Sequence, residues 1–140
     1  SLYLVRYLRR EGGKTGEIAL FEDIAQVGAL AKDRLTEYQC WLNAFYQCAR
    51  LWFEYRSTGD HGFFRYETKG GAFVPLAVKT SQETTGWIYS MHSEPERKAI
   101  ESARSFVKHY SNAKVFIIGP KLSYKAVTDG VYSGSLFSLV

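Results

Sequence analysis

An amphipathic helical segment followed directly by an apolar strand constrains the fold of this chain most. Residues 93–110 carry apolar side chains at helical spacing, namely Ile100, Ala103, Phe106, Val107 and Tyr110. Ser93 and Glu96 have the spacing of a capping box, and Pro95 stands in the first turn, where its missing N–H costs little. Residues 114–119 are nearly all apolar, as in strands that are covered on both faces. This order predicts an α/β fold, in which the apolar strand returns to a mixed sheet flanked by helices.

The other elements are predicted from the same kinds of pattern. Helical spacing recurs in residues 33–51, whose apolar stripe comprises Leu35, Tyr38, Leu42, Phe45 and Ala49. Residues 51–56 have strand character because aromatic side chains dominate them. The remaining expectations are a hairpin of residues 63–67 and 72–80 around a glycine-containing turn, a loop at 82–92 and an edge strand within 131–140.

Length and composition indicate one folded domain. The 140 residues suffice for a core without disulfides or a metal, and 46% of them are hydrophobic, which excludes a disordered chain. We predict the domain at residues 28–140 and an N-terminal extension or inter-domain segment at residues 1–27, whose first apolar run fits either a strand or a helix. Because the chain begins without Met and ends within an apolar run, we expect it to be part of a larger protein.

The charge and cysteine content favour an ordinary cytoplasmic protein. A net charge of +4 is compatible with nucleic-acid binding but does not indicate it. Cys40 and Cys48 would lie about 12 Å apart along one helix, too far for a disulfide, so we expect them to be reduced and buried. The sequence holds no signal peptide and no apolar run of membrane-spanning length, so no membrane partner is expected.

Most catalytic motifs are missing from the sequence. It contains neither of the glycine-rich nucleotide-binding motifs, and His61, His92 and His109 show no metal-ligand spacing. The informative segment is instead residues 74–79, with the sequence Val-Pro-Leu-Ala-Val-Lys.

Regular alternation along a strand would place Ala77 and Lys79 on one face, with Val74, Leu76 and Val78 on the other. A carboxylate two residues before such a lysine could bind a divalent metal, while the ammonium stabilises the transition state of phosphodiester hydrolysis.

The Pro-x-x-Val-Lys pattern of Pro75, Val78 and Lys79, preceded by a hairpin and followed by a helix and an apolar strand, resembles the PD-(D/E)XK nuclease-like superfamily. The likeness is greatest to the C-terminal domain of unknown function of bacterial and archaeal P-loop (AAA-type) ATPases, whose motif reads approximately Pro-Ile-Glu-Val-Lys. Further segments that resemble this family are residues 35–37, 53–56, 115–118 and 135–139, so the likeness spans residues 28–140. It implies a restriction-endonuclease-like mixed sheet flanked by helices.

The carboxylates of this family are missing from the positions that match its motifs. Ala77 replaces the Glu of the motif, and no carboxylate stands at or near Phe64, where the metal-binding Asp would fall. A divalent metal needs two or more oxygen ligands from the protein, so we expect no metal site and no cofactor. The residues that remain as a vestigial site are Lys79 and Glu37, with Asp60 and Glu67 as weaker candidates.

These departures predict a non-catalytic binding or regulatory module. Its partner would be another protein, its own ATPase module or nucleic acid, and Lys79, Arg56 and Arg65 would contact a nucleic acid. Trp87 and Tyr89 could stack on bases, although rings that cover the core are the simpler interpretation.

Plainer and alternative interpretations stay open. Lys79 could be a solvated strand-end lysine, and Glu37 could be a carboxylate favoured by a helix N-terminus. An active nuclease with migrated carboxylates beside Lys79 would need Mg²⁺ or Mn²⁺. A structural subunit with an aromatic oligomer interface is a third possibility.

Overall fold

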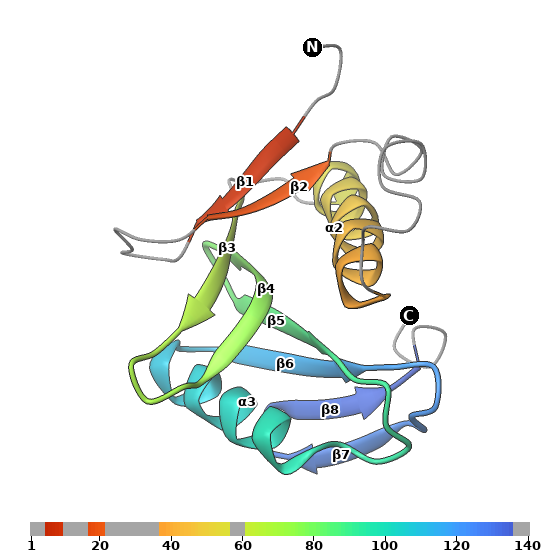
Figure 1. Cartoon of the computed structure of the whole chain (residues 1–140). Helices are drawn as coiled ribbons and strands as arrows, with labels where there is room; N and C mark the ends of the chain where they lie inside the picture. Colours follow the sequence, from red (N-terminus) through yellow and green to blue (C-terminus); the bar gives the residue numbers. More distant parts are fainter. Residues whose placement is uncertain (1–4, 10–16, 22–36, 57–60, 136–140) are drawn as a thin grey trace.

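The computed structural model of the chain describes residues 5–9, 17–21, 37–56 and 61–135 (Figure 1). Helices α2 (Glu37–Arg56) and α3 (Arg97–His109) flank a mixed sheet, so the predicted α/β class is confirmed. The described strands are β1 (Val5–Arg9), β2 (Glu17–Phe21), β3 (His61–Glu67), β4 (Phe73–Thr80), β5 (Thr84–Tyr89), β6 (Ala113–Ile118), β7 (Lys125–Thr128) and β8 (Val131–Gly134).

Six of the described strands form the main sheet in the order β3-β4-β5-β6-β8-β7. β3 and β4 pair antiparallel, which confirms the predicted hairpin, and β4 and β5 also pair antiparallel. β6 then returns parallel to β5 after α3. β8 pairs parallel with β6, and β7 completes this end of the sheet antiparallel to β8. The parallel pairing of β5 with β6 follows from α3, because a helical crossover lets two consecutive strands point the same way.

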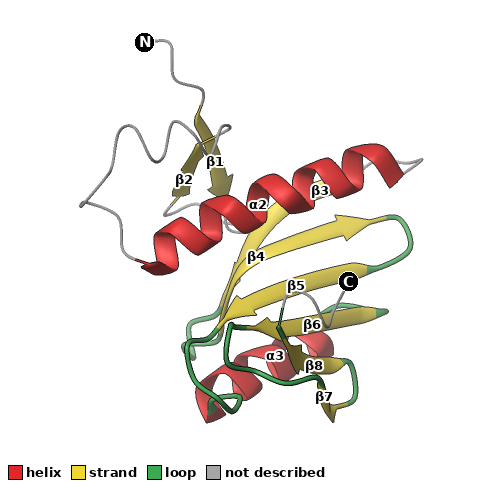
Figure 2. Cartoon of the chain, turned by 90° about the vertical axis from the view of Figure 1, so that its right-hand side faces the viewer, coloured by secondary structure: helices red, strands yellow, loops and turns green. Residues whose placement is uncertain are grey.

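The two helices cover opposite faces of the sheet (Figure 2). On one face, α3 places Phe106 in a core with Val115 and Val131, and all three are 0% exposed. On the other face, α2 packs Leu42 and Tyr46 against the sheet. Strands covered on both faces need apolar residues on both, which explains the apolar run in β6. Neither of the described helices is long and apolar enough to span a membrane.

Strand β4 is irregular at Pro75. Phe64 and Tyr66 of β3 pair with Ala77 and Val74, so β4 spans three residue steps where β3 spans two. Pro75 itself has no pairing partner on either neighbouring strand. This is the geometry of a β-bulge, which accommodates a residue that has no N–H to donate.

The bulge changes which face Val74 occupies. Val74 and Ala77 both pack in the core on the α3 side, whereas Leu76 and Val78 pack on the α2 side. The prediction that Val74 shares a face with Leu76 and Val78 is therefore wrong. Strict alternation assumes an uninterrupted ladder, and one extra residue reverses the side-chain direction beyond it.

The strand predicted for residues 51–56 is also wrong, because α2 continues to Arg56. Extending an existing helix by a few residues is easier than starting a strand, and it outweighs the strand preference of aromatic side chains. Cys40 and Cys48 are free as expected, but both are exposed rather than buried. They lie on the side of α2 opposite the stripe that packs on the sheet.

The loop predicted for residues 82–92 contains β5, an internal strand. Trp87 and Ile88 pack on opposite faces, and Tyr89 stacks on Trp41 with ring centroids 4.7 Å apart. The hydrophobic pattern of the sequence did not indicate β5, because the strand begins with two threonines and Gly86. Gly86 is needed there because an added Cβ would stand 2.8 Å from a Val74 methyl group.

The start of α3 differs from the sequence prediction. Its N-cap is Glu96, and this residue makes no side-chain capping hydrogen bond, so the capping box of Ser93 and Glu96 is wrong. The preceding turn is organised by Ser90, whose hydroxyl accepts a hydrogen bond from the N–H of His92 at 3.2 Å.

The final strand lies inside the sheet rather than at its edge. β8 stands between β6 and β7, and the edge position belongs to β7. Part of the predicted strand, residues 136–140, lies outside the described residues.

A two-stranded hairpin of β1 and β2 occupies the segment predicted as an N-terminal extension. β1 lies beside β3, and β2 lies beside α2 (Figure 1). Because an isolated two-stranded hairpin is marginally stable in water, these neighbours stabilise it.

Candidate functional site

The pairing of β3 with β4 sets the geometry where the family resemblance implies a metal site. Phe64 of β3 stands directly opposite Ala77 of β4, and these are the two positions at which carboxylates would be needed. Directly opposed residues have Cβ atoms about 5 Å apart, so two carboxylates here could share an ion. The structure brings the two positions together, yet neither side chain contains an oxygen atom.

Both positions belong to the apolar core on the α3 side. Ala77 is 0% exposed and Phe64 is 7% exposed. The Phe64 ring lies 6.4 Å from the Phe106 ring and 5.6 Å from the Tyr110 ring, centroid to centroid. A divalent cation here would lose water ligands without gaining protein oxygens. The residues present therefore do not fit Mg²⁺ or Mn²⁺ at this place.

Lys79 lies at the exposed end of β4 and its side chain reaches the C-terminal end of α3. Its Nζ atom is 5.3 Å from the centroid of the Tyr110 ring. A cation over an aromatic face at an exposed site contributes about 0.5–1 kcal/mol. The contact gives Lys79 a structural partner on the face where the resemblance implies a catalytic one.

Three more side chains are connected to the Tyr110 ring, either directly or through one another. The His109 ring lies 4.6 Å from the Tyr110 ring and 5.6 Å from the Tyr66 ring, centroid to centroid. The Tyr66 hydroxyl is hydrogen-bonded to the Ser105 hydroxyl at 2.7 Å. We refer to these five residues, Lys79, Tyr66, Ser105, His109 and Tyr110, as the Lys79 cluster.

The Lys79 cluster contains hydrogen-bond donors but no carboxylates, which metal-assisted hydrolysis would need. Its ammonium, imidazole and hydroxyl groups can donate hydrogen bonds to a partner. None of its five side chains is a carboxylate, so the cluster supplies no ligand of the kind that Mg²⁺ prefers.

The structure does not bring Glu67 and Arg65 to Lys79. The two residues alternate with Phe64 and Tyr66, so they face the α2 side of the sheet, whereas Lys79 faces the α3 side. Glu67 pairs with Phe73, six residues from Lys79 along β4, or about 20 Å at the rise of a strand. Instead, a carboxylate oxygen of Glu67 forms an ion pair with Arg65 at 3.5 Å.

The other predicted residues lie further from the cluster or outside the described chain. Glu37 and Arg56 are the first and last residues of α2, which packs on the face opposite Lys79. Asp60 lies outside the described residues. Within the part of the chain that the structure describes, no group of three or more His, Cys, Asp or Glu side chains could hold a metal ion.

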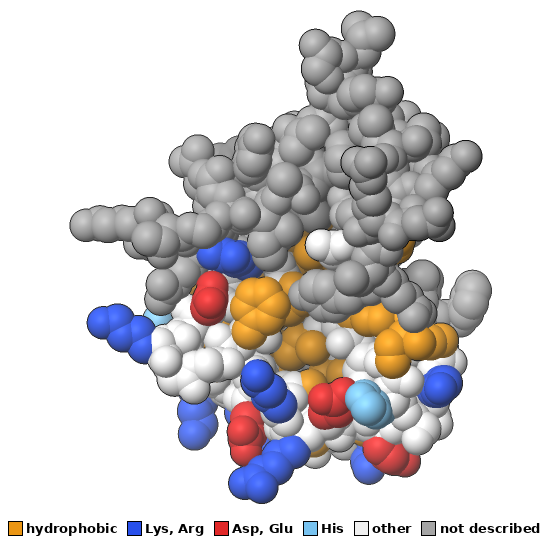
Figure 3. All heavy atoms as spheres, viewed as in Figure 1, with side chains coloured by type: hydrophobic (Ala, Val, Ile, Leu, Met, Phe, Trp, Pro, Cys, Tyr) orange, Lys and Arg blue, Asp and Glu red, His pale blue; other side chains and the backbone are white. Residues whose placement is uncertain are grey.

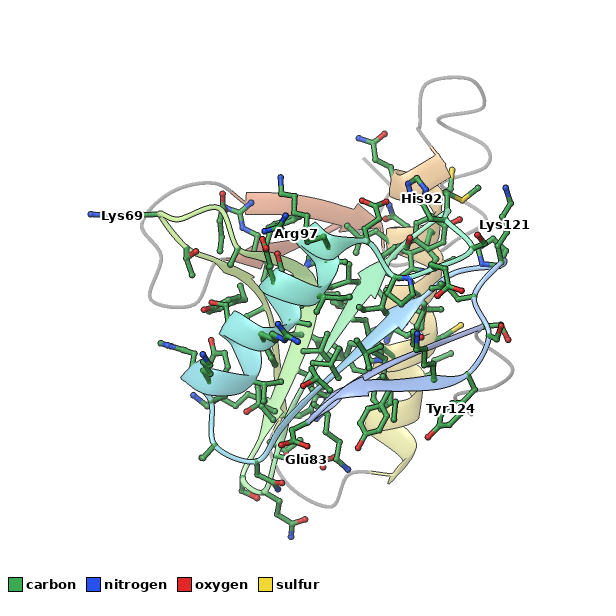
Figure 4. All side chains as sticks on the ribbon, turned by 90° about the horizontal axis from the view of Figure 1, so that it is seen from below. Lys69, Glu83, His92, Arg97, Lys121 and Tyr124 are labelled. Atoms are coloured by element: carbon green, nitrogen blue, oxygen red, sulfur yellow. The ribbon has the colours of Figure 1, made fainter. Side chains whose placement is uncertain are left out.

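Basic side chains on the visible surface are interspersed with acidic ones (Figure 3). The labelled charged residues of Figure 4 come from separate parts of the chain: Lys69 from the β3–β4 turn, Glu83 from the β4–β5 turn, Arg97 from α3 and Lys121 from the β6–β7 connection. Arg97 is itself paired with Glu101, with Nε and Oε1 3.0 Å apart. On the described part of the face in Figure 3, basic and acidic side chains therefore lie side by side, rather than forming a patch of a single sign that would follow a nucleic-acid backbone.

Comparisons with known proteins do not assign the chain to a family. No protein-family model, curated protein or solved structure matches it.

Sequence reasoning missed the contact of Lys79 with Tyr110 and the hydrogen bond between Tyr66 and Ser105. Tyr66 and Ser105 lie 39 residues apart in sequence, and their hydrogen bond depends on α3 packing beside β3. Tyr110 was identified only as the last member of a helical apolar stripe. No local pattern indicates such contacts, because they exist only between elements that pack after folding.

Proposed function

We propose that this chain is a nuclease-like module that binds a partner macromolecule and does not hydrolyse nucleic acid. The observation that carries the proposal is the Phe64–Ala77 pair. These directly opposed residues stand where the resemblance implies the two metal-binding carboxylates, and both are buried among aromatic rings. An ion site that had merely lost one ligand would keep a polar, solvated cavity, whereas this one is filled by the core.

The order of the elements supports the nuclease-like part of the proposal. β4 carries the Pro-x-x-Val-Lys pattern, it is preceded by β3 in a hairpin, and it is followed through β5 by α3 and the apolar β6. This is the context in which the pattern resembles the PD-(D/E)XK superfamily. In this proposal the chain keeps the sheet and helices of the nuclease-like fold but not the residues that hydrolyse nucleic acid.

An active nuclease with a migrated site receives less support. Among the described candidates, Glu67 is on the opposite face from Lys79 and about 20 Å along the strands. Carboxylates that share an ion must lie within a few ångströms of one another, since oxygen ligands of Mg²⁺ bind at about 2.1 Å.

A protein partner fits the surface better than a nucleic acid does. Several exposed acidic groups form ion pairs with neighbouring basic groups, as in the Arg65–Glu67 and Arg97–Glu101 pairs. Trp87 and Tyr89 pack against rings of α2, so they are not arranged as a platform for bases. We propose the ATPase module of the same polypeptide as the partner, in the cytoplasm, a compartment that keeps the free thiols of Cys40 and Cys48 reduced.

A cleavage assay tests the absence of hydrolysis. Purified protein would be incubated with Mg²⁺ or Mn²⁺ and labelled single- and double-stranded DNA and RNA. We expect no cleavage above a metal-free control, and no heat of Mn²⁺ binding in calorimetry. Lys98→Ala is the control, since Lys98 is an exposed lysine of α3 outside the Lys79 cluster. Metal-dependent cleavage that Lys79→Ala removes, and that Lys98→Ala leaves unchanged, would refute the proposal.

A second experiment tests the partner. If a P-loop ATPase module precedes residue 1 in the full-length protein, we expect that module and this chain to associate when they are produced separately and mixed. Failure to associate at any concentration tested would refute the proposed partner. It would not affect the proposed absence of hydrolysis, which the cleavage assay tests separately.

A further inference from the structure

Met91, the only methionine of the chain, links the protein surface to helix α2. It follows the end of β5 and is 38% exposed, so its side chain is open to solvent. The Tyr89 hydroxyl donates a hydrogen bond to the Met91 Sδ atom at 2.6 Å. The Tyr89 ring in turn stacks on Trp41 of α2, with ring centroids 4.7 Å apart. A side chain that solvent reaches therefore accepts the hydrogen bond of a ring that contacts α2.

Ring contacts attach this half of α2 to β5. Besides the Trp41–Tyr89 stack, the Phe45 and Trp87 rings lie 5.3 Å apart, centroid to centroid. Trp41 and Phe45 also stack on each other, with centroids 5.4 Å apart. A displacement of Tyr89 would therefore disturb the row of rings through which α2 packs on β5.

The backbone next to Met91 is held in place. The Ser90 N–H donates to the Ile118 carbonyl at 2.9 Å, and Ser90 is 5% exposed. The His92 N–H donates to the Ser90 hydroxyl oxygen at 3.2 Å. A chemical change at the Met91 sulfur must therefore be accommodated by its own side chain and by Tyr89, rather than by movement of the turn.

We propose that Met91 is a redox-sensitive site, and that oxidation of its thioether weakens the attachment of α2 to the sheet. A hydroperoxide transfers one oxygen atom to the sulfur, which loses two electrons and becomes a sulfoxide. The O–O bond of the peroxide breaks, and the peroxide is reduced to water or to an alcohol. Methionine sulfoxide reductases reverse the reaction, so the change in the protein is reversible.

The expected effect on Tyr89 follows from the geometry. At 2.6 Å, no further atom fits between the Tyr89 hydroxyl oxygen and the Met91 sulfur. The sulfoxide oxygen is a stronger acceptor than the weakly accepting thioether sulfur, and it stands in a different place. The Tyr89 hydroxyl must either move to the new oxygen or lose its acceptor, and both changes disturb its stack on Trp41. This inference does not depend on the proposed function.

Amide hydrogen exchange before and after peroxide treatment tests the proposal. All proteins carry Cys40→Ser and Cys48→Ser, because these exposed thiols of α2 would also be oxidised. Mass spectrometry should show one added oxygen atom on the peptide that contains Met91. Exchange in α2 should then become about fivefold faster, as for the loss of one ordinary hydrogen bond, while exchange in α3 stays unchanged. A methionine sulfoxide reductase should restore the original rate.

Two further variants separate this mechanism from general oxidative damage. Met91→Leu keeps an apolar side chain of similar size but has no sulfur, so peroxide should leave exchange in α2 unchanged. Tyr89→Phe keeps the ring and removes the hydroxyl, so oxidation of Met91 should change exchange in α2 by less than about twofold. Unchanged exchange in α2 of the fully oxidised protein would overturn the proposal. A fivefold acceleration in Met91→Leu or in Tyr89→Phe would overturn it as well.

Discussion

At the scale of single residues, the end of β6 depends on a glycine. A Cβ atom at Gly119 would stand 1.8 Å from the carbonyl oxygen of Ser90, which is far inside contact distance. Ser90 is itself held, since its N–H donates to the carbonyl of Ile118 at 2.9 Å. The backbones after β5 and β6 therefore approach more closely than any side chain at residue 119 would allow.

We expect Gly119→Ala to lower the free energy of unfolding by about 3 kcal/mol, because the backbone must move to relieve the overlap. Urea denaturation followed by circular dichroism measures this change. Gly62→Ala is the matched control, since nothing lies within 4 Å of its added Cβ. Equal stability of the two variants would show that the ends of β5 and β6 leave room for a side chain at residue 119.

At the scale of elements, α3 is fixed to β4 by a partly buried hydrogen bond as well as by apolar packing. The Phe73 N–H donates to the Ser102 hydroxyl at 3.1 Å, and Ser102 is 4% exposed. Ser102 thus holds the first residue of β4, next to the turn of the β3–β4 hairpin. By contrast, Ser93 is exposed and lies before the helix that it was predicted to cap.

Ser102→Ala should destabilise the protein by about 1 kcal/mol, because it leaves the partly buried N–H of Phe73 without its side-chain acceptor. Ser93→Ala should change stability by less than about 0.5 kcal/mol, since it removes no capping bond. Thermal unfolding of both variants measures the difference. If Ser93→Ala instead lowers the free energy of unfolding by about 1 kcal/mol, Ser93 does cap the helix, as the sequence predicts.

At the scale of the whole molecule, protection from solvent is concentrated in the middle of the sheet. β4, β5 and β6 have paired neighbours on both sides, and most of the 0% exposed core residues belong to β4, β6, α3 and β8. β7 has a partner on one side within the described sheet, and β1 and β2 form a sheet of their own.

Amide hydrogen exchange should follow this arrangement. We expect the slowest exchange in β4, β5 and β6, with free energies of opening near the global value, and faster exchange in β7 and the β1–β2 hairpin. Mass spectrometry of peptic fragments resolves these segments. Protection of β1 and β2 equal to that of β5 would mean that the hairpin belongs to the central cooperative unit.

Several features followed from sequence alone because their signals are local. Helical spacing identified both helices, the glycine turn identified the hairpin, and the apolar run of β6 indicated a sheet with both faces covered. Ala77 also followed from the sequence, as a residue that contains no carboxylate whatever its neighbours are.

Tertiary structure decided the rest, because the deciding forces act between distant segments. The Pro75 bulge, the internal position of β8 and the strand at residues 84–89 depend on pairing partners that local patterns do not specify. The candidate site depends on them too. The sequence shows only that Phe64 and Ala77 are apolar. The register of β3 against β4 shows that they lie opposite each other in the core. Register is fixed by burying one face of a whole sheet, so it can be read only from the folded molecule.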